Sequence, residues 1–186
     1  MAVKRLIIDG YGQIELNNVA FRRDGRIEAQ CHPDAEDFAD VFVENGMLLA
    51  VDNIARVVKF VSADEEFPVA LVYSAEHMYD ERTPGLKNFK LNGKEDFLPR
   101  LGYLAIGDKF ITNCLCADDA EFADVAALKE AYNGEGRIYG GVSEMGAIKV
   151  SATKPEVGPV LLAVRGTGAG TMPDGQFGMK FQVLSV

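Results

Sequence analysis

The residues best suited to chemistry in this sequence are Cys114 and Cys116, which are separated by one residue. On a β-strand, residues two apart point the same way, so both sulfur atoms can reach one metal ion. A tetrahedral site needs two further ligands, and besides carboxylates the chain offers only Cys31, His32 and His77. Because no second pair of ligands has metal-site spacing, the pattern favours small buried thiols, and we predict no metal site.

His77 is the candidate for acid–base chemistry. It lies in "SAEHMYDER", three residues after Ser74 and close to several acids. A serine nucleophile with a histidine base also needs an orienting acid and an oxyanion hole, and nothing in the sequence fixes either. The segment is more typical of a solvated polar loop that faces a partner. We therefore predict that the protein is not an enzyme and has no catalytic residue and no cofactor.

The glycine-rich stretch "RGTGAGTMPDG" at 165–175 raises the question of a phosphate-binding loop. Such loops join a strand to a helix whose first N–H groups face the anion. Here the following residues are "QFGMKFQVLSV", in which Phe177, Met179, Phe181 and Val183 alternate with polar residues or glycine. A period of two predicts a half-buried strand, so the glycines are predicted to join two strands of a hairpin.

Most of the remaining chain has the pattern of short strands separated by turn signals. The expected elements are a β-meander over 5–31, a hairpin over 47–61 that turns at Asp52-Asn53, a strand over 67–74, strands on either side of a turn at Gly107-Asp108, and strands over 146–152 and 158–165.

Helical patterns are few. A helix is predicted over 118–134, where Asp118 and Glu121 resemble a capping box and Gly134 supplies the stop. Residues 33–46 fit a shorter helix or a structured loop. These elements together predict a mainly β protein, with short antiparallel strands in a sandwich or barrel-like core and one or two short helices.

We expect a single β-rich domain over 1–186. The alternative is two related β sub-modules, about 1–76 and 100–186, with a polar arm at 77–99 between them.

The alternative rests on an internal echo. The segment "DAEDFADV" at 34–41 recurs as "DAEFADV" at 119–125, and each copy follows a strand-like run that ends in cysteine. Duplication of a small β-rich module explains the echo, and coincidence among common residues explains it equally well.

The composition limits the partners. With 19 Lys and Arg against 28 Asp and Glu, the formal net charge is −9, which argues against nucleic-acid binding. No run approaches the roughly 20 apolar residues of a membrane helix, so we expect no membrane partner. Three cysteines, an odd number, fit thiols made in a reducing cytosol rather than a disulfide framework.

Several stretches together carry a family resemblance. The pattern runs from "GMLLAVDN" through "PVALVYS" and the polar "HMYDERTPGLKNFKL" to "FLPRLGYLAIGDKFITNC", and it ends with "PVLLAVR" and "GMKFQVLSV". It resembles structural proteins encoded beside the major capsid protein in tailed bacteriophages and prophages of Gram-positive bacteria. The resemblance implies a capsid decoration or cement protein that sits on the virion surface and is made in the bacterial host cytoplasm. It implies binding to the major capsid protein and to itself, often as a trimer, and it carries over no site residue.

Two alternatives stay open. A phage tail tube or terminator component is also β-rich but assembles into rings. A small metal- or ligand-binding β-barrel enzyme belongs to a different class, and its metal ligands would be Cys114, Cys116 and His77. On the leading interpretation, the interface candidates are the N-terminal strand, the 77–99 arm and the C-terminal hairpin.

Overall fold

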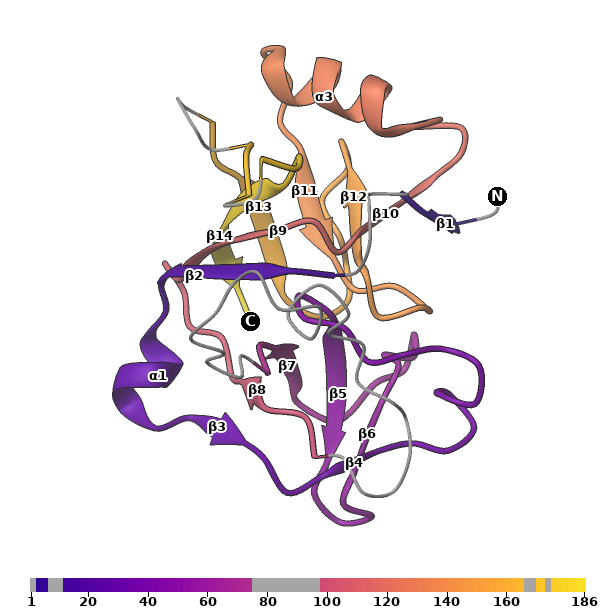
Figure 1. The fold of residues 1–186 in the computed structure, drawn as a ribbon, viewed down its shortest axis with the longest axis vertical. Helices are drawn as coiled ribbons and strands as arrows, with labels where there is room; N and C mark the ends of the chain where they lie inside the picture. Colours follow the sequence, from indigo (N-terminus) through magenta and orange to yellow (C-terminus); the bar gives the residue numbers. More distant parts are fainter. Residues whose placement is uncertain (1–2, 7–11, 75–97, 166–169, 173–174) are drawn as a thin grey trace.

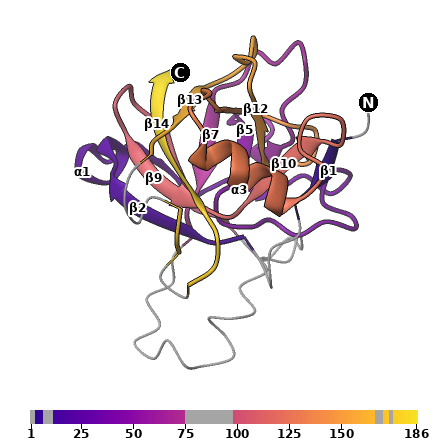
Figure 2. The same ribbon diagram turned by 90° about the horizontal axis from the view of Figure 1, so that it is seen from above.

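The computed structural model describes residues 3–6, 12–74, 98–165, 170–172 and 175–186. The fold is mainly β, as expected, and these residues form two sheets and two helices (Figure 1). The larger sheet curls into a half-barrel, which Figure 2 shows from above.

The larger sheet has eight strands. Their order is β1 (Val3–Arg5), β10 (Leu115–Asp118), β12 (Ile148–Ser151), β11 (Tyr139–Gly141), β13 (Val160–Ala163), β14 (Met179–Ser185), β9 (Lys109–Thr112) and β2 (Ile14–Asn18). The smaller sheet has the order β3 (Ile27–Glu28), β8 (Leu101–Gly102), β7 (Val69–Val72), β5 (Leu48–Asp52), β6 (Val57–Lys59) and β4 (His32–Pro33).

The same topology occurs twice along the chain. Residues 27–102, the first module, form strands β3 to β8, and residues 109–185, the second module, form strands β9 to β14. Numbered from its own first strand, each module has the order 2-4-3-5-6-1. In both modules strands 2 and 4 pair in parallel and the other listed neighbours pair antiparallel. The two modules therefore repeat one arrangement of strands.

The register repeats as well. Ile27 pairs with Gly102 in the first module, and Phe110 pairs with Phe181 in the second. Matching the first residues of the two parallel pairs, His32 and Leu115, also matches Ile27 to Phe110 and Cys31 to Cys114, because all three matches have the same sequence offset. These equivalences support the duplication hypothesis.

The boundaries of the repeat differ from the expected sub-modules at 1–76 and 100–186. β1 and β2 belong to the second module's sheet, and β8 belongs to the first module's sheet. The expected polar arm at 77–99 lies almost wholly outside the described residues.

An N-terminal arm, described over residues 3–6 and 12–18, covers both edges of the second module. β1 pairs antiparallel with β10, and β2 pairs antiparallel with β9. One segment reaches both edges because β9 runs into β10 through a bend of two residues, Asn113 and Cys114. Figure 1 shows β2 lying across the junction between the modules. The expected β-meander over 5–31 is therefore wrong, since β1, β2 and β3 pair with distant strands and residues 20–24 are helical.

The other strand predictions are confirmed. The hairpin over 47–61 is β5 and β6, and the strands over 67–74, 146–152 and 158–165 contain β7, β12 and β13. The turn at Gly107-Asp108 is present, but the strands beside it lie in different sheets.

The C-terminal hairpin is also confirmed. β13 pairs antiparallel with β14, so the glycine stretch joins two strands. Met179, Phe181 and Val183 are fully buried, and the residues between them are less so.

The helix expected over 118–134 begins later, as α3 (Val125–Asn133). Asp124 caps it by accepting a hydrogen bond from the Ala127 N–H at 2.8 Å. Asp118 cannot start a helix because it ends β10 and pairs with Val3. The segment 33–46 is a structured loop apart from Pro33, which ends β4. No helix in the described part of the chain is long and apolar enough to cross a membrane.

Helix α1 (Ala20–Asp24) fills a gap in the first module. Its Phe21 is fully buried and contacts Tyr73, with ring centroids 4.9 Å apart. The ring lies against Gly102, where any Cβ atom would overlap it. Gly102 is equivalent in register to Phe181, so α1 supplies the aromatic side chain that the strand lacks.

We expect Gly102→Ala to lower the free energy of unfolding by about 1–3 kcal/mol, because the added methyl group must displace the Phe21 ring. Urea denaturation measures the change. Gly136→Ala is the matched control, since a Cβ there meets no atom within 4 Å. Adding Phe21→Leu to Gly102→Ala should restore part of the loss. If Gly102→Ala and Gly136→Ala were equally stable, this packing would be contradicted.

Candidate functional site

The sequence-predicted cysteines lie in the core. Cys31, Cys114 and Cys116 are at most 1 % exposed and belong to one hydrophobic cluster. His32 is exposed on β4, and His77 lies outside the described residues. Within the described ranges, no group of three or more His, Cys, Asp or Glu side chains is arranged to hold a metal ion.

Burial keeps the thiols neutral. Burial raises the pKa of Cys31 and of Cys116 to about 11. It also raises the pKa of Cys114, although the adjacent Arg5 guanidinium opposes the shift. A thiolate is the form that attacks electrophiles and binds metals, so these cysteines are poor nucleophiles near neutral pH.

Cys31 and Cys114 occupy equivalent places. Each lies at the bend between the first and second strand of its module, and each side chain is buried. A small apolar thiol fits such a tight, buried bend, which explains both residues without any reactive role.

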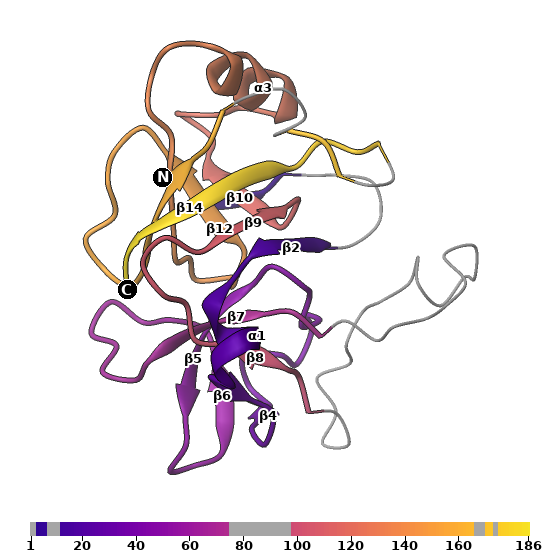
Figure 3. The same ribbon diagram turned by 90° about the vertical axis from the view of Figure 1, so that its left-hand side faces the viewer.

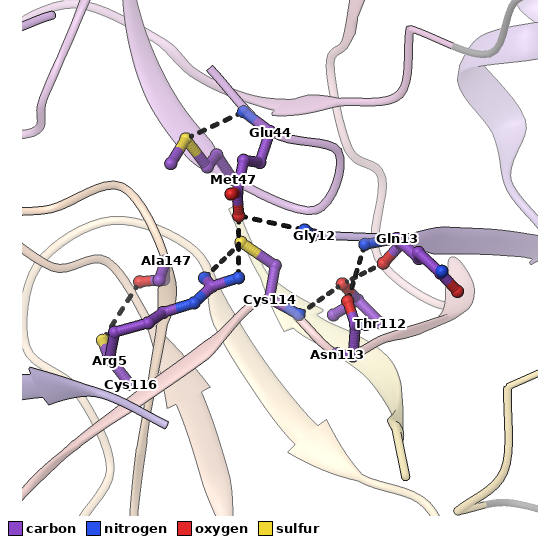
Figure 4. A network of polar contacts seen from close by, with 10 residues as sticks. All are labelled: Arg5, Gly12, Gln13, Glu44, Met47, Thr112, Asn113, Cys114, Cys116 and Ala147. Carbon is purple, nitrogen blue, oxygen red and sulfur yellow. Dashed lines mark hydrogen bonds and ion pairs between the residues drawn. The ribbon is translucent and has the colours of Figure 1, made fainter. Parts of the chain in front are cut away.

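A polar cluster that sequence reasoning did not identify surrounds Arg5 (Figure 4). Its Nη1 donates to the Cys114 Sγ and its Nη2 to the Glu44 Oε2, both at 2.8 Å. The Gly12 N–H donates to the same carboxylate oxygen at 3.0 Å. The Glu44 side chain is only 16 % exposed, so this ion pair is partly buried. The cluster ties the arm to the loop before β5 and to the bend in the second module.

A second group of contacts fixes the arm beside the bend. The Gln13 N–H donates to the Asn113 Oδ1 at 2.6 Å, and the Thr112 hydroxyl donates to the Gln13 carbonyl at 2.6 Å. The Cys114 N–H donates in turn to the Thr112 hydroxyl at 3.0 Å. These side chains provide hydrogen-bond partners for backbone groups at a buried bend, which is a structural role.

No motif in the sequence indicates this cluster. Arg5 and Glu44 lie 39 residues apart, and neither belongs to a recognisable motif. Only the pairing of the arm with β9 and β10 brings them together.

A pocket of about 310 Å³ lies where the two modules meet, and we call it the seam pocket. Each module contributes the connection before its fifth strand and the residues that follow its sixth strand. The first module contributes Phe67, Pro68, Tyr103 and Leu104, and the second contributes Val157, Gly158, Pro159 and Val186. Arg26 and Glu65 are its charged residues. Figure 3 shows β14 ending at this junction.

Exposed apolar side chains surround the seam pocket. Val157 and Val186 line it and are exposed, and Leu184, two residues before Val186, is exposed on β14. Ile106, 72 % exposed, lies two residues after Leu104. Exposed apolar side chains near an apolar recess are typical of a protein–protein contact.

Comparison with known proteins identifies no relative: no family model, no curated protein and no solved structure matches this chain.

We expect Arg5→Met to lower the free energy of unfolding by about 1–3 kcal/mol, because the Glu44 carboxylate is left partly buried without its cation. The double variant Arg5→Met, Glu44→Gln should lose less than the two single losses combined, which urea denaturation of all four proteins measures. Lys4→Met is the control, because the Lys4–Asp119 pair is exposed and such pairs contribute about 0–1 kcal/mol. An Arg5→Met protein as stable as the control would refute this role.

We expect the folded protein to react slowly with a thiol reagent at pH 8 and the urea-unfolded protein to expose all 3 thiols. The folded pKa values of Cys31 and Cys116, about 11, lie above the ordinary value of 9.0, so the folded state holds these protons more tightly. The stability that this gives is complete below pH 9 and is lost as the pH rises to about 11. The Cys31→Ala, Cys116→Ala variant should show a shallower loss of stability over this interval; an unchanged slope would contradict the assignment.

Proposed function

We propose that this protein is a non-enzymatic structural protein of a virion, a capsid decoration protein that binds the major capsid protein and itself. It would be made in the bacterial host cytoplasm and would end on the capsid surface. The family resemblance of the sequence supplies the virion setting. The structure supports a role in protein docking. Apolar side chains are exposed at its turns and are suited to contacts with a partner, whereas its polar clusters are not arranged for chemistry.

One observation carries the proposal. The Cys114 sulfur atom and the Arg5–Glu44 ion pair hold the arm to the core, whereas large apolar side chains are left at the surface. Burying an exposed Ile contributes roughly 1.5–3 kcal/mol, so rigid apolar side chains at turns are effective anchors for a partner.

Ile54 at the tip of the β5–β6 hairpin is such an anchor. It is 90 % exposed, and the Asp52 carboxylate fixes its turn by accepting hydrogen bonds from the Ile54 and Ala55 N–H groups at 2.9 Å. The turn is therefore formed before any partner binds, which lowers the entropic cost of docking.

Induction of a source strain, followed by purification of the released particles, tests the proposal. We expect the protein in intact heads, at a constant ratio to the major capsid protein, and quantitative mass spectrometry of separated heads and tails measures this. Presence in tails alone would favour a tail tube or terminator component. Absence from particles, together with a chelator-sensitive melting temperature, would favour the metal-binding alternative.

A further inference from the structure

The seam pocket has the size and the lining of a site for a small molecule. Its volume of about 310 Å³ lies at the lower end of the range of about 300–1,000 Å³ that is typical of ligand pockets. Pro68 and Pro159 hold equivalent places in the two modules, each one residue before the fifth strand, and neither has a backbone N–H. Together with Phe67 and Val157 they form an apolar wall. A molecule that fills this pocket therefore needs an apolar body.

The acid of the pocket is engaged by its own loop. The Glu65 side chain is only 3 % exposed, and the Lys59 Nζ lies 3.9 Å from its carboxylate. That carboxylate accepts hydrogen bonds from the Phe67 N–H at 3.1 Å and from the Ser62 hydroxyl at 3.4 Å. Glu65 thus holds the wall of the pocket in place, and its charge is compensated by groups of the protein.

The charge of Arg26 is not compensated in this way. Its Nη2 donates to the Leu104 carbonyl at 3.1 Å, which holds the exposed guanidinium at the pocket and uses one of its five N–H groups. Over the described residues, no ion pair includes Arg26. Asp24 is nearby but already accepts two hydrogen bonds from Arg23, at 2.6 and 3.2 Å. A fixed guanidinium beside an apolar recess favours a ligand with an anionic group.

Tyr103 supplies a second donor beside Arg26. Ile27 faces Gly102 in the β3–β8 ladder. The next facing residues are Arg26 and Tyr103, so their side chains lie on the same face of the sheet, and both line the pocket. The Tyr103 hydroxyl accepts a long hydrogen bond of 3.5 Å from the Asn53 side chain, which leaves its proton for an acceptor. Burial raises the pKa of Tyr103, so the phenol keeps this proton near neutral pH.

We propose that the seam pocket binds a small monocarboxylic acid. The apolar body of the ligand packs against Phe67, Pro68 and Pro159, and its carboxylate accepts hydrogen bonds from Arg26 and Tyr103. A phosphate group, with a charge of about −1.5 to −2, would need more than one cation, and Arg26 is the one cation among the described lining residues. This site is additional to the proposed function and does not depend on it.

Isothermal titration calorimetry of the isolated full chain with benzoate, 3-phenylpropionate and hexanoate tests the site. We expect at least one of these acids to bind with a dissociation constant of about 1 mM or below. The uncharged amide of the same acid should bind about tenfold or more weakly, because hydrogen bonds between charged groups are the stronger ones. Absence of binding by all three acids, or an amide that binds as tightly as its acid, would overturn the proposal.

Variants locate the site. Arg26→Gln should weaken binding of the acid about tenfold or more and abolish the preference for acid over amide, which a purely structural role of Arg26 would leave unchanged. Val157→Trp should abolish binding by filling the pocket. Arg22→Gln is the matched control, because Arg22 is an exposed arginine of α1 that does not line the pocket.

Urea denaturation shows whether each variant folds. The assignment fails if Arg22→Gln weakens binding as much as Arg26→Gln does, or if Arg26→Gln retains the preference for the acid. Neither result bears on whether the protein occurs in virions, so this site and the proposed function can fail separately.

Discussion

The pairing of the N-terminal arm with the bent strand β9–β10 is the constraint on which the rest of the structure depends. β9 and β10 are the two edge strands of the second module. Without the arm, their outer backbone groups would have no strand to pair with. Unpaired edges of this kind invite association with other chains. The arm pairs with both edges, and the Arg5 guanidinium then reaches Glu44 of the first module. A single segment thus closes one module and attaches it to the other.

The first module meets the same need differently. Its edge strands β3 and β4 have only two residues each, and Pro33 has no N–H to offer a neighbour. Short strands and proline are standard protection for a sheet edge. Because the modules share topology and register, the arm is the main difference between them at their edges. The repeated unit therefore tolerates either a covering strand or a shortened edge.

The strands were largely predictable because their signal is local. Alternation and the turn at Asp52-Asn53 depend on neighbouring residues. The turn is confirmed, and the alternation predicted over 177–183 is confirmed from Met179, where β14 begins. The partners of the first 31 residues were not predictable, since three apolar bursts in sequence look the same whether they pair together or with distant strands. The helix boundary failed for a related reason: Asp118 has the right residue type for a cap but is held in β10 by Val3.

The internal echo shows how a weak sequence signal gains meaning from topology. Phe38 and Phe122 are both buried, and the N–H of each donates to the carbonyl of the aspartate four residues before it. Both segments follow the second strand of their modules, so the resemblance extends from residue types to backbone hydrogen bonds. The shared cysteines at the preceding bends belong to this same repeat. Their matching positions then reflect a packing requirement that both modules share, and burial raises the pKa of both thiols, which agrees with packing better than with metal binding.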